Sequence, residues 1–351
     1  MSTGLHASAQ LLWLVVLLRL CQSGPLLLPP QRPHAASAPA TSSNGSTTSL
    51  SSEDVFIAVK TSGQFHQSRL LPVLATWYRR AGPHTWIFTD AEDAALDRLT
   101  GGRVINTGCA ADHSRTALSC KMEAELAAFL RPPTQNAAST SPPPAWFCHV
   151  DDDNYVNMEQ LVVTLAGYPA TGEWYLGKVS TAQQLEVSDR RSSASPPPTH
   201  RFWFATGGAG FCLSRPLVER MGPWISGGRF QELADDIRLP DDVAVGYLVE
   251  VVLGVPLRPL ADLHSHLEPL RLVEDLSKAI TLSYSRYEDT GEDNVVEEED
   301  GEDARRAIKE DRTRFLYIHC RLYPEDCSIS RAQLLKGTAR REHGTARTEQ
   351  L

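Results

Sequence analysis

The chain of 351 residues has no excess of positive charge. Its 34 Lys and Arg residues are outnumbered by 43 Asp and Glu residues, and the formal net charge at pH 7 is −9. A nucleic-acid-binding protein needs a basic face that neutralises phosphates. The acidic balance therefore argues against a nucleic-acid partner, whereas an apolar fraction of 42% suffices for a sizeable core.

Two short motifs are also missing from the sequence. The seven cysteines include no Cys-x-x-Cys pair, so their spacing does not suit a zinc site. No Gly-x-Gly-x-x-Gly follows the first expected strand, so the chain lacks a dinucleotide-binding fingerprint.

Long hydrophobic runs are scarce, and the clearest one lies near the N-terminus. Residues 11–18 are apolar, Arg19 interrupts them, and apolar character resumes at Leu20 and over 26–28. The run is short for a membrane-spanning helix, so residues 1–28 are predicted to be a signal peptide or a signal-anchor, although few charges precede it. A buried helix of the fold is the alternative.

Composition divides the rest of the chain. Residues 29–53 are rich in Pro, Ser, Thr and Ala, which is typical of a stem, and Asn44 begins a glycosylation sequon there. Residues 54–330 are expected to form the folded domain. Residues 331–351 are polar and are expected to be a disordered tail.

The cysteines favour an exported protein. Cys21 lies in the N-terminal apolar segment, and the other six are Cys109, Cys120, Cys148, Cys212, Cys320 and Cys327. Cys109 and Cys120 are close enough in sequence to close a small loop, and so are Cys320 and Cys327. Cys148 would then pair with Cys212, and this bridge would tie the strand that precedes a run of three aspartates to a later strand. Six free buried thiols are the alternative, and spacing alone does not fix the connectivity.

Strands and helices alternate along the first half of the folded domain. The expected strands cover residues 55–60, 86–89, 104–106 and 146–150. The expected helices cover 69–80 (with Ser68 as a possible N-cap), 90–99, 117–130 and 158–166. This alternation predicts an α/β protein with a mostly parallel, doubly wound sheet.

Residues 146–156 are the most informative stretch. An apolar strand runs directly into Asp151, Asp152 and Asp153. Three adjacent carboxylates resist burial unless a positive group lies among them, and open α/β sheets bind ligands at the carboxyl ends of their strands. The pattern favours a divalent-metal site that holds a phosphorylated substrate. A solvated turn or a helix N-cap is the alternative.

Three further segments carry polar groups suited to the same chemistry. Residues 202–211 join an aromatic strand to a glycine cluster, residues 239–246 place Asp241 and Asp242 before an apolar helix, and His264 and His266 follow an expected strand from residue 255. A glycine-rich backbone can approach a ligand closely, a carboxylate can act as a base, and imidazole can bind a metal. The respective alternatives are a tight turn, a helix N-cap and a pair of surface histidines.

Three stretches are expected to be loops: residues 131–145, 187–199 and 288–303. The first two are rich in Pro, Ser and Thr. The third is acidic and is expected to be a solvated, mobile insertion. A calcium site is a poor alternative, because the run lacks regular ligand spacing and a turn glycine in register.

In its order of motifs, the chain resembles the Fringe family of glycosyltransferases from about Asp54 to about Cys327. The resemblance is carried by residues 55–61, 65–66, 68–69, 86–90, 113–115, 118–122, 146–157, 202–212 and 224–228, together with the Pro-Asp-Asp and His-x-His segments. The three expected loops depart from the family pattern, but none of them removes a residue that the resemblance makes catalytic.

The resemblance implies an inverting β-1,3-N-acetylglucosaminyltransferase of the GT-A-like, nucleotide-sugar-binding α/β fold. Such an enzyme uses manganese (Mn²⁺) and moves N-acetylglucosamine from UDP-GlcNAc to the 3-hydroxyl of O-linked fucose on EGF-like repeats of Notch-type receptors, which modulates Notch signalling. It is expected in the Golgi as a single-pass type II membrane protein with a luminal catalytic domain, or as a cleaved, secreted form.

Residue roles also follow from the resemblance. Asp153 matches the metal-binding carboxylate and His266 the second protein ligand. Asp152 and Arg69 match contacts to the donor. Asp242 matches the catalytic base, and its neighbour Asp241 is the fallback.

Three other functions remain open. A related β-1,3-galactosyl- or glucosyltransferase with another acceptor would share these motifs. A catalytically silent, metal-dependent binding protein of the secretory pathway is a second alternative. A phosphohydrolase that uses the acidic tip is a third, although it lacks an evident nucleophile motif.

Overall fold

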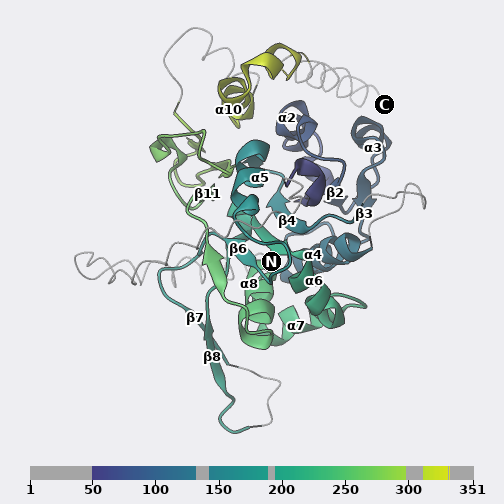
Figure 1. The fold of residues 1–351 in the computed structure, drawn as a ribbon, viewed down its shortest axis with the longest axis vertical. Helices are drawn as coiled ribbons and strands as arrows, with labels where there is room; N and C mark the ends of the chain where they lie inside the picture. Colours follow the sequence, from purple (N-terminus) through teal and green to yellow (C-terminus); the bar gives the residue numbers. More distant parts are fainter. Residues whose placement is uncertain (1–49, 132–141, 189–193, 298–310, 331, 333–351) are drawn as a thin grey trace, which may run out of the picture. The chain divides into compact units, whose positions relative to one another are not determined.

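The computed structural model describes residues 50–131, 142–188, 194–297, 311–330 and 332 (Figure 1). All of these belong to one unit, Thr48–Leu351. The expectations for residues 1–28, for nearly all of 29–53 including Asn44, for most of the 131–145 loop and for nearly all of the 331–351 tail lie outside the described residues. Within the described ranges, no helix is long and apolar enough to cross a membrane.

A seven-stranded sheet forms the centre of the fold. Its strands run in the order β10 (Leu257–Pro259), β6 (Tyr175–Gly177), β9 (Phe211–Ser214), β4 (Trp146–Asp151), β1 (Val55–Lys60), β2 (Thr85–Thr89), β3 (Val104–Asn106). Strand β9 is antiparallel to both of its neighbours, and the remaining pairings are parallel. The predicted α/β class with a mostly parallel sheet is confirmed.

The two central strands are apolar on both faces. Phe56 and Phe147 belong to one hydrophobic cluster, whereas Ile57 and Cys148 belong to another. Successive side chains of a strand point to opposite faces, so a near-continuous apolar sequence serves a sheet that is covered on both sides. This explains the near-continuous apolar sequences of β1 and β4, in which even His149 is buried.

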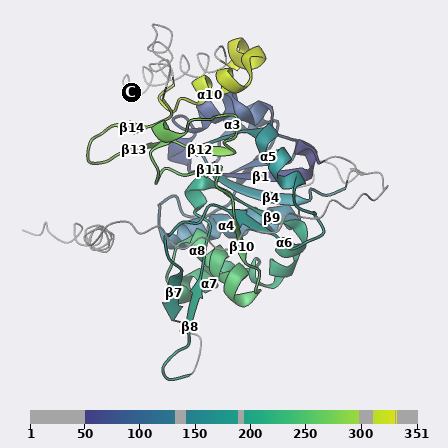
Figure 2. The ribbon, with the colours of Figure 1, turned by 60° about the vertical axis from the view of Figure 1, so that its left-hand side comes forward.

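Helices cover both faces of the sheet, as a doubly wound fold requires. The first cluster contains side chains of α4 (Arg115–Leu130), α6 (Arg215–Met221), α7 (Arg229–Ile237) and α8 (Asp241–Gly246). The second contains side chains of α2 (Leu70–Ala75), α5 (Met158–Ala166) and α10 (Phe315–Leu322). Figure 2 shows α4, α7 and α8 on one side of the sheet and α5 on the other.

The local sequence sets the helix ends. Ser114 caps α4 and Asn157 caps α5 with side-chain oxygens that accept from the first-turn amides. Helix α3 (Ala94–Thr100) begins after the capping Asp93 and ends at Gly101, whose φ of 68° suits glycine. The predicted helix over 90–99 therefore starts four residues too early. Helix α8 continues into a π-helical turn, Tyr247–Val252.

The predicted helix over 69–80 is wrong in its second half. Helix α2 ends at Ala75, and a 3₁₀ turn follows at Trp77–Arg79. Thr76 separates them with a non-helical backbone, and its hydroxyl donates to the Pro72 carbonyl at 2.5 Å. Ser68 is not the N-cap either; that position belongs to Arg69, whose side chain reaches Asp152 instead.

A small sheet continues from the acidic tip. Strand β5 (Asn154–Val156) pairs with β12 (Thr281–Ser283), and β12 pairs with β11 (Leu263–His264). Strand β4 ends at Asp151 and β5 begins at Asn154, so Asp152 and Asp153 form the turn between the two sheets. The remaining 3₁₀ turns are Ser52–Asp54, Gly63–Phe65, Gly207–Ala209, Gly222–Trp224, Leu270–Leu272 and Pro324–Asp326.

Two expected loops contain regular structure. Strands β7 (Leu185–Ser188) and β8 (Thr199–Phe202) pair antiparallel, so the predicted 187–199 loop is wrong at residues 187–188 and at residue 199, which belong to these strands. Val187 is also buried. Strand β13 (Ser285–Arg286) pairs with β14 (Asp293–Asn294). The prediction of a solvated, mobile insertion is therefore wrong for residues 293–296, whereas 298–310 lie outside the described residues.

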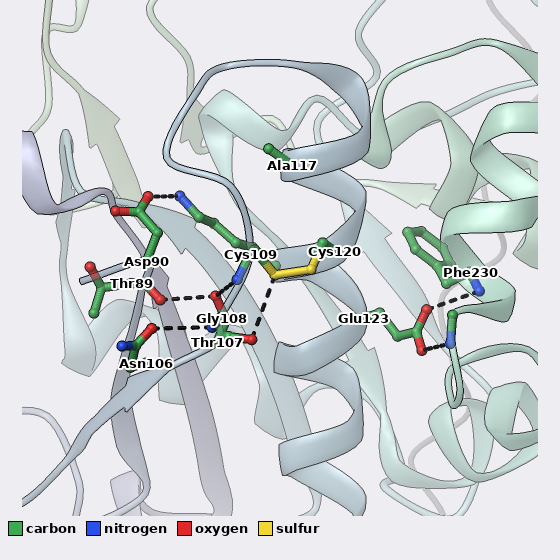
Figure 3. Close-up of a disulfide and its surroundings, with 12 residues drawn as sticks. Thr89, Asp90, Asn106, Thr107, Gly108, Cys109, Ala117, Cys120, Glu123 and Phe230 are labelled. Carbon is green, nitrogen blue, oxygen red and sulfur yellow. Dashed lines mark hydrogen bonds and ion pairs between the residues drawn. A yellow bond between two sulfur atoms is a disulfide. The ribbon is translucent and has the colours of Figure 1, made fainter. Parts of the chain in front are cut away.

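The structure contains three disulfides, joining Cys109 to Cys120, Cys148 to Cys212, and Cys320 to Cys327. These are the pairs that proximity in sequence favoured, and six free thiols are excluded. The middle bridge joins register partners on β4 and β9, whose Cα atoms are 4.1 Å apart. The first bridge ties the loop after β3 to helix α4, as Figure 3 shows.

Candidate active site

The acidic tip lies at the carboxyl end of β4, beside the end of β1. Lys60, the last residue of β1, is in register with Asp151. The side chains of Asp152 and Asp153 are only 4% and 17% exposed. Water therefore solvates these carboxylates poorly, and stabilisation of their negative charges depends on nearby protein groups.

Two cations compensate the carboxylates. Lys60 Nζ lies 3.3 Å from Asp151 Oδ1 and 3.0 Å from Asp241 Oδ2, so it joins the tip to the start of α8. Burial alone would lower the pKa of Lys60, but these two carboxylates outweigh burial and raise it well above its ordinary value. Lys60 is thus held as a cation.

Arg69 and Thr61 hold the second aspartate. Arg69 Nη1 lies 3.1 Å from Asp152 Oδ1 and 3.5 Å from Asp153 Oδ2. The Thr61 hydroxyl donates to Asp152 Oδ2 at 2.6 Å. Both oxygens of Asp152 therefore already have protein partners.

The protein groups around Asp153 do not fully compensate a negative charge on its carboxylate. Burial and the neighbouring carboxylates of Asp151 and Asp152 raise its pKa to about 8. Its Oδ1 accepts from the Ser283 hydroxyl at 3.1 Å. The site thus favours one more positive group next to Asp153.

Asn154 links Asp153 to the glycine cluster. Its Nδ2 lies 3.4 Å from Asp153 Oδ1 and donates to the Gly208 carbonyl at 3.3 Å. The buried Asn154 Oδ1 has no hydrogen-bond partner within the described part of the chain. A buried acceptor without a donor is rare in a folded protein.

His266 lies on the other side of the glycine cluster. A Cβ on Gly208 would stand 2.7 Å from Cε1 and from Nδ1 of the His266 ring. The absent side chain therefore makes room for the imidazole. Burial lowers the pKa of His266, which favours the neutral, metal-binding form of the ring. His264, by contrast, pairs with Glu268 at 3.3 Å.

The two aspartates at the start of α8 have different surroundings. Pro240 occupies the N-cap position, so neither aspartate has the expected alternative role of a helix cap. Asp241 is 4% exposed and bound to Lys60. Asp242 is half-buried and accepts from the Gly207 amide at 3.0 Å and from the Val243 amide at 2.8 Å.

Asp242 also differs from an ordinary aspartate in its pKa. Burial and the adjacent Asp241 carboxylate raise the pKa of Asp242 to about 6. A general base is most effective when its pKa lies near the working pH. Through the Gly207 amide, Asp242 also lies against the glycine cluster, whose Gly208 contacts the His266 ring. The structure therefore assembles, at one edge of the sheet, a carboxylate cluster, an imidazole and a candidate base.

Comparison with known proteins identifies the family. The family model described as Fringe-like matches residues 50–326. This chain belongs to the Fringe-like family. Lunatic fringe β-1,3-N-acetylglucosaminyltransferases from Danio rerio and Homo sapiens are 46% and 48% identical over 278 residues, covering 79% of this chain and 70% and 69% of theirs. The Fringe glycosyltransferase of Drosophila melanogaster is 42% identical over 272 residues, covering 78% and 62%.

Solved structures give weaker likenesses. The glycosyltransferase GlyE of Streptococcus pneumoniae has a TM-score of 0.34 at 10% identity, covering 59% of this chain and 45% of GlyE. Mouse xyloside xylosyltransferase 1 has a TM-score of 0.31 at 10% identity, covering 59% and 85%. Likeness at this level is too slight to carry inference.

The Fringe-like chain places the residues expected from its motifs in one region. Asp152, Asp153 and Arg69 touch one another, and His266 and Asp242 flank the glycine cluster. The described ranges contain no group of three or more His, Cys, Asp or Glu side chains that could hold a metal ion.

Several site residues escaped the sequence interpretation. They are Lys60, Thr61, Asn154, Ser283 and the backbone of Gly207. A lysine that ends an otherwise apolar strand was a usable signal for Lys60. The roles of the others depend on contacts between distant segments, for which the sequence carries no local pattern.

Proposed function

We propose that this chain is an inverting β-1,3-N-acetylglucosaminyltransferase that moves N-acetylglucosamine from UDP-GlcNAc to the 3-hydroxyl of O-linked fucose on EGF-like repeats, including those of Notch-type receptors. The names of its relatives support the reaction. The observation that carries the proposal is the arrangement of Asp242, with its raised pKa, across the glycine cluster from the acidic tip.

Asp242 is the proposed base. A sugar hydroxyl is a weak nucleophile at neutral pH, and a carboxylate that takes its proton in the transition state contributes about 10²–10⁴-fold. The backbone amides of Gly207 and Val243 fix the orientation of Asp242. One base and one displacement invert the anomeric carbon, so the reaction needs no covalent intermediate.

Asp153 and His266 fit a divalent cation such as Mn²⁺. The raised pKa of Asp153 marks a surplus of negative charge, and the unpartnered Asn154 Oδ1 lies in the same cluster. A carboxylate oxygen and a neutral imidazole are suitable ligands for manganese, with phosphate and water oxygens as the remainder. When bound, the cation would supply Lewis-acid stabilisation of the departing diphosphate.

Other side chains would bind and orient the donor. Arg69, whose side chain is 37% exposed while it holds Asp152, is the proposed contact to a donor phosphate. Thr61 and Arg69 fix Asp152, which is the proposed contact to the sugar or ribose of the donor. Lys60 holds the acidic tip and the base helix together.

The proposed location is the Golgi lumen. The N-terminal segment would be a type II membrane anchor or would be cleaved to release a secreted form. The disulfides agree with an oxidising compartment.

A donor panel tests the function. The full luminal chain is incubated with Mn²⁺, an O-fucosylated EGF-like repeat and UDP-GlcNAc, UDP-galactose or UDP-glucose in turn. Transfer from UDP-GlcNAc to the fucose, as a β-linked product by nuclear magnetic resonance, is expected. Preference for another UDP-sugar would favour the related galactosyl- or glucosyltransferase, and no UDP release with any donor would favour a catalytically silent binding protein.

A further inference from the structure

One segment of the chain touches both proposed metal ligands. We call residues 281–296 the β12–β14 segment. At its beginning, Ser283 Oγ donates to Asp153 Oδ1 at 3.1 Å, and the Tyr284 amide donates to the Asp153 carbonyl at 2.7 Å. Its first strand therefore fixes both the side chain and the backbone of Asp153.

The end of the same segment holds the loop that carries His266. Asn294 is 3% exposed, and its Nδ2 donates to the carbonyls of His266 at 3.1 Å and Glu268 at 2.9 Å. Its Oδ1 accepts from the Leu270 amide at 2.9 Å. The donor and the acceptor of the Asn294 side-chain amide thus both form hydrogen bonds with the backbone of residues 266–270.

A second contact fastens this loop to the central sheet. Glu268 accepts from the Ser265 amide at 2.9 Å and binds Lys178, which follows β6, at 2.6 and 2.7 Å. Asn294 and Glu268 therefore hold the loop from two sides. The side chain of His266, which belongs to this loop, packs against Gly208.

We propose that Asn294 is the positioning residue for His266, and that the β12–β14 segment acts as a bracket that sets His266 relative to Asp153. The inference rests on the proposed metal-dependent function. Asp153 and His266 are more than a hundred residues apart in sequence, so their relative placement depends on a third element that contacts both. Residues that orient a metal ligand without touching the metal typically change its affinity 10–100-fold when they are replaced.

The test compares Asn294→Ala with the wild-type chain. Isothermal titration calorimetry measures UDP binding over a series of Mn²⁺ concentrations, and the readout is the Mn²⁺ concentration that gives half-maximal binding. We expect this concentration to rise about tenfold in Asn294→Ala. In the transfer assay the KM for Mn²⁺ should rise by a similar factor, while the KM for the acceptor stays unchanged.

Controls separate positioning from a general loss of structure. Asn106→Ala removes an exposed asparagine that also holds a loop, through the Gly108 amide and Glu92, at the far edge of the sheet, and it should leave the Mn²⁺ requirement unchanged. His266→Ala should abolish the Mn²⁺ dependence. Thermal unfolding establishes that each variant is folded at the assay temperature.

The outcomes are distinct. If the wild-type chain binds UDP equally well without Mn²⁺, the proposed metal site fails, and this inference fails with it. If the wild-type chain and His266→Ala differ as expected but Asn294→Ala needs no more Mn²⁺ than the wild type, only the inference is overturned. If Asn294→Ala does not fold, Ser283→Ala tests the other end of the bracket, which holds Asp153. An unchanged Mn²⁺ requirement in Ser283→Ala would then overturn the proposed bracket.

Discussion

Asp241 and Asp242 are adjacent residues with different chemistry, because only one of them is neutralised by a cation. Asp241 forms an ion pair with Lys60, which also pairs with Asp151. Among the described residues, the hydrogen-bond partners of Asp242 are two backbone amides, and its pKa is raised to about 6. At the residue scale, Asp242 rather than Asp241 is therefore the proposed base, because Asp241 is already paired with a lysine.

Replacing Asp242 should remove the base without disturbing the donor site. Asp242→Asn is expected to lower kcat by about 10²–10⁴-fold, while the Kd for UDP with Mn²⁺ stays within about twofold of the wild type. Steady-state transfer and calorimetry measure the two. Asp236→Asn, an exposed change on α7, is the matched control. Near-normal turnover in Asp242→Asn would remove Asp242 from the mechanism.

The pH dependence of transfer should report the same group. The pKa of Asp242 is raised, so below about pH 6 its carboxyl is protonated and cannot accept a proton, and above about pH 6 it can. With Mn²⁺ saturating, log(kcat/KM) should fall by about one per pH unit below that value. The residual activity of Asp242→Asn should lack this slope. A wild-type rate that stays level down to about pH 4.5 would contradict the assignment.

Sequence patterns could predict the residues that carry their own local signature. Asp152 and Asp153 end an apolar strand, and Asp242 begins an apolar helix. Ser283 and Asn294 have no such signature, because each acts only through segments brought close by folding. Asn294 even lay in a stretch whose acidic composition predicted a solvated insertion, yet it is buried.

At the scale of elements, the glycine-rich turn Gly207–Ala209 connects the base to the imidazole. The Gly207 amide holds Asp242, the Gly208 carbonyl accepts from Asn154, and the missing side chain of Gly208 gives His266 its place. Glycine is required here by the close approach of a ring rather than by backbone conformation.

An added methyl group should displace His266. In Gly208→Ala the new Cβ would meet two ring atoms at 2.7 Å, and the ring at the end of a side chain can move. We expect the Mn²⁺ concentration for half-maximal UDP binding to rise about tenfold, with the free energy of unfolding changed by less than about 1 kcal/mol. Gly222→Ala, which meets nothing within 4 Å, is the control. Unaltered Mn²⁺ dependence in Gly208→Ala would argue against His266 as a ligand.

Most elements were predictable because their periodicity or apolar character is local. Strand β3 and helix α5 have the bounds that the sequence predicts. The break at Thr76 and the β7–β8 pair were missed. The break depends on the Thr76 hydroxyl, which donates to a carbonyl of the helix backbone. The β7–β8 pair depends on hydrogen bonds between two strands, and the sequence between those strands has a composition typical of loops.

For the whole folded unit, the alternation of strands and helices predicted the mostly parallel sheet, but not the reversed direction of β9. An antiparallel strand between β4 and β6 depends on the path of the connections, which local sequence does not encode. The Cys148–Cys212 bridge crosses this pairing and encloses the longest loop of the three disulfides, with a separation of 64 residues.

That bridge should contribute most to stability. In the chain-entropy picture, a separation of 64 residues corresponds to about 4 kcal/mol and a separation of 7 to about 2–3 kcal/mol. The double variant Cys148→Ala/Cys212→Ala should therefore lose more unfolding free energy than Cys320→Ala/Cys327→Ala. Denaturant unfolding measures both, and the reverse order would contradict this ranking.

The most direct test of the account is a crystal structure of the folded domain with Mn²⁺ and UDP. Anomalous scattering locates the ion independently of the protein atoms. We predict an ion bound by Asp153 and His266 and by oxygens of the diphosphate. An ion bound elsewhere, or a diphosphate held without contact to this pair, would contradict the account.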